Sequence, residues 1–191
     1  MLKRLFIVIT FLPCLVFANP DQGFGYRLSF SSLSVDDVLI DTNRTSQVLP
    51  FTFFYTQGLK RDLYFYSEVA WKSFKTRAAS GGVGQTINVA EVAFGLDYQY
   101  RLSRSIKPRF GIGVDYMNTT YSKRYSMDSD GFLLDRYADE KKNLFSIYLN
   151  ASHYWKLSKT WDIGANARTA LPFGFSDIKE TSVGISGMYH Y

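Results

Sequence analysis

The chain has 191 residues, of which 46% are hydrophobic and 17% aromatic, and its formal net charge is +5. This length suits one domain, and a positive charge so mild and so dispersed excludes the usual strongly basic nucleic-acid-binding protein. The single cysteine, Cys14, excludes a disulfide framework and a thiolate metal site within the chain.

Residues 1–18 have the pattern of a secretory signal peptide. Lys3 and Arg4 provide the positive start, an apolar run follows, and Ala18 ends the segment with a small side chain. The apolar run is too short for a comfortable transmembrane helix. We therefore expect cleavage after Ala18, which leaves residues 19–191 as one domain with 20 basic and 17 acidic residues and a charge of about +3.

The rest of the chain contains eight stretches in which apolar and polar residues alternate, a pattern that indicates β-strands with two different faces. We expect strands at residues 24–30, 49–56, 63–72, 90–101, 108–116, 145–155, 161–171 and 181–191. Their apolar faces contain no Asp, Glu, Lys or Arg. Their polar faces contain ten charged residues, namely Arg27, Glu68, Lys72, Glu91, Asp97, Arg101, Arg109, Asp115, Asp162 and Arg168.

This segregation of charge decides the fold class. A cation that faces lipid costs about 2–4 kcal/mol near the middle of a bilayer, so a membrane barrel keeps its charges inside, whereas a soluble barrel shows the reverse. After the signal segment, no apolar run is long enough for a spanning helix. The sequence therefore predicts an all-β protein, an eight-stranded antiparallel up-and-down transmembrane β-barrel.

The final strand supports a closed barrel. Residues 181–191 alternate almost without interruption, and the chain stops on the aromatic Tyr191. A free strand edge of this kind invites aggregation in a soluble protein, whereas a closed barrel has no free edge.

The expected connections alternate between short and long. Short turns lie at residues 57–61, 102–104 and 157–159, long loops lie at 31–47, 75–86 and 118–142, and the connection at 172–177 is intermediate. Outer-membrane barrels have short periplasmic turns and long external loops. We therefore expect both ends of the processed chain in the periplasm.

The segment 105–114, the hairpin 154–165 and the closing strand 183–191 resemble the small eight-stranded outer-membrane barrels of Gram-negative bacteria. This superfamily includes the OmpA transmembrane domain, OmpX and the opacity-type proteins, and the resemblance is architectural. It implies a monomer that is exported to the periplasm and inserted into the outer membrane. It also implies that the barrel-assembly machinery reads the last strand through an assembly signal formed by Val183, Ile185, Tyr189 and Tyr191.

The interior charges allow two interpretations. An eight-stranded barrel is only just wide enough for its own side chains to fill it, and the ten charges balance at five and five. We interpret them as a plug of salt bridges and hydrogen bonds. The alternative is a narrow passive pore along Arg27, Glu68, Lys72 and Asp97.

A lipid A-modifying enzyme is a second alternative, because such barrels use His, Ser and an acid near the outer rim. The chain has two histidines, His153 and His190. By alternation His153 faces lipid beside Trp155, Ser152 faces the opposite side, and His190 faces inward at the end of the chain. We therefore expect no enzymatic activity, and we interpret His153 as an interfacial residue.

Neither a metal nor a cofactor is expected. Residues 128–131 resemble a fragment of a calcium loop but lack the later glutamate. Residues 81–84 are glycine-rich without the Lys and Ser/Thr of a phosphate loop.

The long loops are the best candidates for a specific task, because a rigid scaffold commonly carries its function on loops. Candidate contacts to lipopolysaccharide phosphates are the cations Lys75, Arg77, Lys123, Arg124 and Arg136. Ordinary solvated loop charge explains them equally well. Phe132, Leu133 and Leu134 form either a lid over the barrel mouth or a contact surface for a host or envelope protein. We expect a protein of envelope structure or surface interaction, including adhesion.

Overall fold

The computed structural model describes residues 22–37, 42–76, 83–103, 105–172 and 178–191. Of residues 33–37, 42–48, 172 and 178 only the backbone is described. The expected signal peptide and Arg77 lie outside these residues. Within them, no helix is long and apolar enough to cross a membrane.

All the regular structure described is β-strand. The strands are β1 (Gln22–Asp37), β2 (Thr42–Val48), β3 (Phe51–Lys60), β4 (Leu63–Thr76), β5 (Val83–Gln99), β6 (Arg109–Met127), β7 (Leu133–Tyr137), β8 (Glu140–Lys156), β9 (Trp161–Pro172) and β10 (Ile178–His190).

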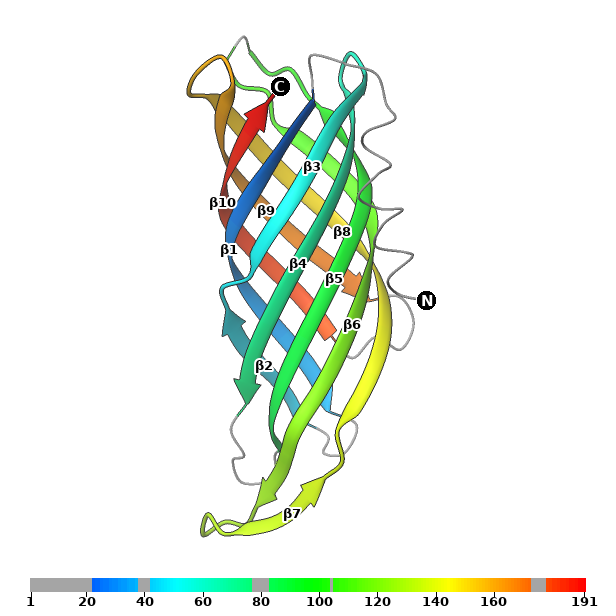
Figure 1. Cartoon of the computed structure of the whole chain (residues 1–191), viewed down its shortest axis with the longest axis vertical. Coiled ribbons are helices and arrows are strands. Elements are labelled where there is room, and N and C mark those ends of the chain that lie inside the picture. The colour runs from blue at the N-terminus through cyan, green and yellow to red at the C-terminus, as the bar shows by residue number, and fades with distance from the viewer. Residues whose placement is uncertain (1–21, 38–41, 77–82, 104, 173–177) are drawn as a thin grey trace.

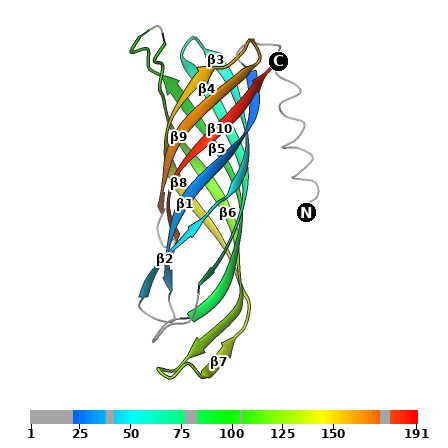
Figure 2. The same ribbon diagram turned by 90° about the vertical axis from the view of Figure 1, so that its left-hand side faces the viewer.

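Eight of these strands close into an antiparallel barrel in the order β10-β9-β8-β6-β5-β4-β3-β1. The cylinder closes where β10 pairs with β1, from Gly23 opposite His190 to Val35 opposite Ile178. β2 pairs with the far half of β1, and β7 pairs with the far end of β6. Figures 1 and 2 show tilted strands around one axis, with the C-terminus at the short-turn end and β7 projecting beyond the opposite, outer end. The predicted fold class is confirmed.

Burial alternates along the barrel strands as the sequence pattern predicts. On β1, Phe24, Tyr26 and Leu28 are about half exposed, while Arg27 is 3% exposed and Ser29 is 4% exposed. The buried side chains of the described strands point into the barrel, so the lumen is the core of this part of the protein. Its outer wall carries the large apolar side chains, which is the polarity of a barrel surrounded by lipid.

The strands run further toward the outer end than the sequence pattern predicts. The expected loop 118–142 is mostly β6, β7 and β8, and the expected loop 31–47 is largely β1 and β2. On β6, the outward residues beyond Tyr116 are Asn118, Thr120 and Ser122. Polar residues then stand on the outward face too, so the apolar–polar contrast fades although strand pairing continues.

The second expected strand, residues 49–56, corresponds to β3, which begins two residues later, at Phe51. β2 and β3 pair with β1 in one continuous register, with Val48 opposite Ser31 and Phe51 opposite Leu28. Pro50 has no N–H to donate to a ladder, which explains why Leu49 and Pro50 separate β2 from β3 although both pair with β1 in the same register.

Two glycines make room for a large, fully buried side chain of the lumen, Tyr148. Gly95 on β5 lies opposite Gly113 on β6, and the fully buried Tyr148 of β8 packs over both. A Cβ at Gly113 would overlap the backbone oxygen of Phe94 and lie 2.5 Å from Tyr148 Cζ. The pair of glycines therefore fixes where the Tyr148 ring can lie.

Gly113→Val is expected to lower the free energy of unfolding by about 1–3 kcal/mol, because the added side chain overpacks the slot that holds Tyr148. Urea unfolding in lipid vesicles, followed by heat-modifiable gel migration, measures this change. Ala167→Val is the matched control, since Ala167 lies on the exposed outward face of β9. Equal losses for the two variants would contradict a specific role of the slot.

Candidate functional site

The lumen contains a network of buried charges with Arg168 at its centre. The Arg168 guanidinium donates from Nη2 to Glu91 Oε1 at 2.7 Å and to Asp115 Oδ2 at 2.6 Å, and it also ion-pairs with Glu68. These carboxylates come from β5, β6 and β4, whereas Arg168 comes from β9. One side chain thus links opposite walls of the barrel.

Two further cations complete this lumen network. Arg27 of β1 donates to Glu68 Oε2 at 3.0 Å, and Lys72 of β4 ion-pairs with both Glu91 and Glu180. The network therefore consists of three cations and four carboxylates, namely Arg27, Lys72, Arg168, Glu68, Glu91, Asp115 and Glu180.

Glu180 is the member that sequence reasoning missed. It lies on β10, is 8% exposed and faces inward. It stands one residue before the expected start of the last strand, so it was not assigned to a face. Extending the alternation of Ser182, Ser186 and Met188 backward by one step would have placed Glu180 on the inner face.

A second polar group lies nearer the short-turn end. The Arg109 guanidinium carbon lies 3.7 Å from the centroid of the Tyr64 ring, and Asn150 Nδ2 donates to Asp97 Oδ2 at 3.5 Å. Asp162 Oδ2 lies 2.8 Å from His190 Nε2. Asp97, Arg109 and Asp162 are therefore buried inside the barrel, with partners different from those of the lumen network.

Apolar and aromatic side chains separate and cap these polar groups, and the Tyr66 hydroxyl among them also hydrogen-bonds with Arg27 and Glu68. One buried cluster consists of Phe54, Tyr66, Ala93, Tyr148 and Met188, and a second consists of Phe74, Ile87, Val89, Met117, Tyr121 and Leu144. On the inner face of β5, Ala93 lies between Glu91 and Asp97, so the expected line of charges from the network to Asp97 is interrupted.

The space left beside the lumen network is small. A cavity of about 10 Å³ is lined by residues that include Arg27, Glu68, Lys72 and Glu180. A volume of this order holds about one water molecule. Side chains therefore fill the barrel at this level.

Arg101 is a correction to the expected set of interior charges. It lies beyond the end of β5, its side chain is 43% exposed, and its Nε donates to Asp62 Oδ1 at 2.6 Å. β5 ends at Gln99, so the alternation that would have carried Arg101 inward stops two residues earlier. The other nine expected interior charges are buried.

The two histidines lie far from an arrangement for nucleophilic catalysis. His153 lies on the outward face of β8, and its ring is 4.5 Å from that of Trp155 in an edge-on contact. Ser152 is buried on the inner face. His190 Nε2 is beside Asp162, and its Nδ1 lies 3.3 Å from the carbonyl oxygen of Gln22. Neither histidine is next to a serine hydroxyl in these contacts.

At the outer end, residues 124–137 form a β-hairpin, here called the outer hairpin. Its turn is fixed by Asp128, whose Oδ1 accepts from the N–H groups of Asp130 at 3.0 Å and Phe132 at 2.7 Å. Gly131 in this turn has a φ of +86°, a conformation that glycine adopts without strain. The sequence 128–131 is thus a hairpin turn.

The loop candidates separate into buried and exposed side chains. Arg124 is 9% exposed and donates to Glu140 Oε2 at 2.9 Å, so it does not offer a free cation to a surface ligand. Lys75, Lys123 and Arg136 are exposed. Phe132, Leu133 and Leu134 are 70%, 49% and 60% exposed, so they do not pack as a lid over the barrel mouth.

The expected assembly signal lies on the outer face of β10. Val183, Ile185 and Tyr191 are exposed, and Tyr189 packs against Phe24 and Trp161 with ring centroids 5.7 and 5.3 Å away. Among the described residues, no group of three or more His, Cys, Asp or Glu side chains could hold a metal ion.

Together these features define an eight-stranded membrane barrel with an ionic, filled lumen and an apolar outer wall. The sequence matches no protein-family model. It also matches no curated protein sequence.

Solved structures share the fold. Neisserial surface protein A matches with a TM-score of 0.66 and 9% identity over 89% of this chain and 97% of its own. Ail, the attachment invasion locus protein of Yersinia pestis, matches with a TM-score of 0.58 and 12% identity over 89% and 97%. The outer membrane protein OprG from Pseudomonas aeruginosa matches with a TM-score of 0.57 and 14% identity over 91% and 98%. The chain thus has the architecture of the small outer-membrane barrels.

Arg168→Ala is expected to destabilise the barrel by about 3–5 kcal/mol, because it leaves Glu68, Glu91 and Asp115 buried without their shared cation. The free energy of unfolding in lipid vesicles measures the loss. Arg101→Ala removes a partly exposed ion pair and should cost no more than about 1 kcal/mol. Similar losses for the two variants would contradict the central position assigned to Arg168.

Proposed function

We propose that the protein is a non-enzymatic outer-membrane barrel that holds the outer hairpin as a rigid surface for contact with another protein. The exposure of Phe132, Leu133 and Leu134 on consecutive positions carries the proposal. Single exposed apolar residues are ordinary, but contiguous ones mark interaction sites.

The way the hairpin is built supports a preformed contact surface. Its two arms pair from Arg124 opposite Tyr137 to Ser126 opposite Asp135, and after a register shift Met127 lies opposite Leu133. A paired hairpin loses less conformational entropy on binding than a free loop of the same length. Lys123 and Arg136 are exposed beside the apolar residues, as are Asp130, Asp135 and Asp139, so the rim carries charges of both signs. Ail, which shares the fold, is named for attachment and invasion, and its name favours adhesion over other surface roles.

The rest of the molecule supports a scaffold role. We infer that the barrel-assembly machinery reads Val183, Ile185, Tyr189 and Tyr191 at the end of the chain, and the closed edge between β1 and β10 suits a monomer. Two observations argue against a lipid A-modifying enzyme. Ser152 and His153 face opposite sides of β8, so they do not form a nucleophile–base pair. His190 lies beside Asp162 rather than beside a serine hydroxyl.

A passive pore is the second candidate function, and the filled lumen argues against it. The purified barrel in a planar bilayer is expected to give no steady open level, because ion pairs and two apolar clusters occupy the described interior and the cavity beside the lumen network measures about 10 Å³. Single-channel recording measures the conductance. A steady open level in the wild-type protein would overturn the scaffold proposal in favour of a pore.

Replacing Phe132, Leu133 and Leu134 by Ser is expected to lower adhesion by at least about tenfold. Burying even one such side chain contributes about 1.5–3 kcal/mol, and about 1.4 kcal/mol corresponds to a factor of ten in affinity. The measurement is attachment of a non-adherent Gram-negative strain producing the barrel to epithelial cell monolayers.

The matched control replaces Leu102, Ile106 and Leu157 by Ser. These three apolar residues are also exposed, but they lie at the short-turn end. Both variants should retain heat-modifiable migration, which shows that they fold. Unchanged adhesion in the hairpin variant, or an equal loss in the control, contradicts the proposed role of the outer hairpin.

A further inference from the structure

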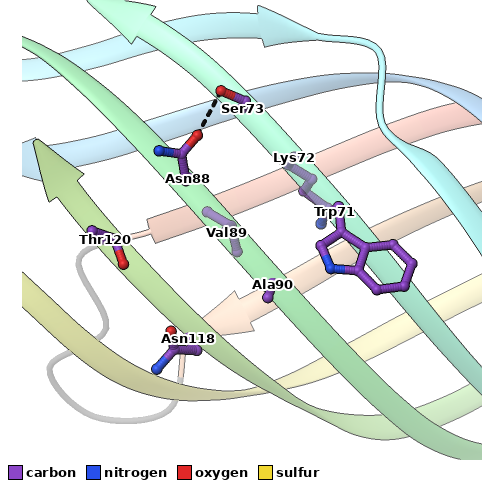
Figure 3. Close-up of a pocket in the computed structure, with 8 residues that line it drawn as sticks. All are labelled: Trp71, Lys72, Ser73, Asn88, Val89, Ala90, Asn118 and Thr120. Carbon is purple, nitrogen blue, oxygen red and sulfur yellow. Dashed lines mark hydrogen bonds between the residues drawn. The ribbon is translucent and has the colours of Figure 1, made fainter.

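A groove of about 300 Å³ lies on the outward wall of the barrel, away from both the lumen and the outer hairpin. Its outward-facing lining consists of Trp71 and Ser73 from β4, Asn88 and Ala90 from β5, and Asn118 and Thr120 from β6. Figure 3 shows these side chains along three neighbouring strands, with the Trp71 indole at one side. The volume is of the order of a small-molecule site.

The strand register brings these residues into two adjacent rows. Trp71, Ala90 and Asn118 lie opposite one another across β4, β5 and β6, and so do Ser73, Asn88 and Thr120. Ala90, with its small side chain, stands between Trp71 and Asn118. The groove is therefore concave: Trp71 forms an aromatic wall, Ala90 leaves the centre low, and the polar side chains line the rest.

The polar side chains of the groove are neutral and oriented. Ser73 Oγ donates to Asn88 Oδ1 at 2.7 Å, which leaves the amide nitrogen of Asn88 able to donate to a ligand. Asn118 Nδ2 donates to Asn143 Oδ1 at 2.7 Å, which leaves the Asn118 carbonyl able to accept. Fixed amide and hydroxyl groups beside an exposed indole suit a sugar ring, whose hydroxyls need such partners and whose C–H face packs on an aromatic plane.

The groove lies at the edge of the apolar belt. The row nearer the short-turn end is Val69, Val92, Tyr116 and Phe145, which is apolar or aromatic throughout. Trp71 and Tyr116 are aromatic residues with a polar group, the type that stands where membrane meets water. A ligand in the groove would therefore contact the belt on one side and water on the other.

Two cations flank the groove, Lys141 beside its outer row and Lys75 beyond that row. Lys141 of β8 lies opposite Thr120 in the register, and Lys75 lies two residues beyond Ser73 on the same face of β4. Both side chains are exposed. Their position fits phosphate groups attached to a sugar seated in the groove.

We propose that this groove binds the phosphorylated saccharide headgroup of a glycolipid in the outer leaflet. The sugar ring lies against Trp71 between Asn88 and Asn118, its phosphates lie toward Lys75 and Lys141, and its acyl chains continue along the apolar belt. The neutral lining and the position at the membrane edge favour an anchored lipid over a soluble polyanion. This site is separate from the adhesion proposed for the outer hairpin.

Trp71 offers a direct reporter of binding. The chain has three tryptophans, so a Trp155→Phe, Trp161→Phe background leaves Trp71 as the single emitter. The full barrel in phospholipid nanodiscs is titrated with purified lipopolysaccharide, and the Trp71 emission is followed. Phospholipid alone and the deacylated, water-soluble saccharide are titrated in parallel.

The test variant is Asn88→Leu combined with Asn118→Leu, and the control is Thr181→Leu, an exposed outward residue on β10. Loss of the two fixed amides is expected to weaken lipopolysaccharide binding at least about tenfold, with no change in the control. Lys75→Gln combined with Lys141→Gln is expected to weaken binding and to flatten its dependence on salt. All variants are first checked for heat-modifiable migration.

Equal affinity of the Asn variant and the wild type would overturn the proposal, as would binding that only the Lys variant weakens. Binding of the soluble saccharide as tight as that of lipopolysaccharide would exclude an anchored lipid as the occupant. The outer-hairpin Ser variant should bind lipopolysaccharide like the wild type, so failure of adhesion and failure of the groove are separate results.

Discussion

Closure of the sheet between β1 and β10 is the constraint on which the rest of the structure depends. Inside a hydrocarbon layer no water satisfies backbone N–H and C=O groups, so a sheet that crosses it must leave no edge. The register from Gly23 opposite His190 to Val35 opposite Ile178 provides that closure. Closing eight strands fixes a narrow lumen. Every charge excluded from the lipid face must therefore share that small space with the others.

The packing of the lumen follows from this confinement. Buried carboxylates are costly unless cations and hydrogen bonds satisfy them, and Arg168 meets three of them at once because its planar guanidinium has several donors. Tyr148 fills space in which a further charged side chain would lose its hydration without gaining a partner. Gly95 and Gly113 leave room for its ring. Such an interior, satisfied and crowded, favours a rigid cylinder over an open path. A rigid cylinder is also what a surface-contact role needs, since it holds the outer hairpin in one orientation.

Much of this architecture was predictable from alternation, but only where the two faces of a strand have different solvents. Within the apolar belt, parity assigned Arg27, Glu68 and Asp115 to the interior correctly, because lipid on the other side forbids charge. Beyond the belt the rule weakens. The sequence predicts Arg124 as a loop contact candidate, yet it is buried and pairs with Glu140, since β6 continues to Met127. For Arg101 the prediction was wrong in the opposite sense: alternation places it inside the barrel, but β5 ends at Gln99 and the side chain is partly exposed. The groove has no sequence signal, because its residues on different strands are 15 to 49 positions apart and only the register joins them.

The same boundary explains where specific contacts can form. Along the belt, side chains on the outer wall face acyl chains that differ little from one another, so a Val or a Phe there gains burial but little specificity. In the lumen, crowding excludes ligands. The strands nevertheless continue beyond the lipid, and there polar side chains such as Asn88 and Asn118 can stand on the outer wall without a desolvation cost. Strand pairing still holds them in fixed positions. The region just outside the apolar belt of the outer wall thus has a backbone fixed by strand pairing, and it tolerates polar as well as apolar side chains. Both the groove and the outer hairpin lie in this region.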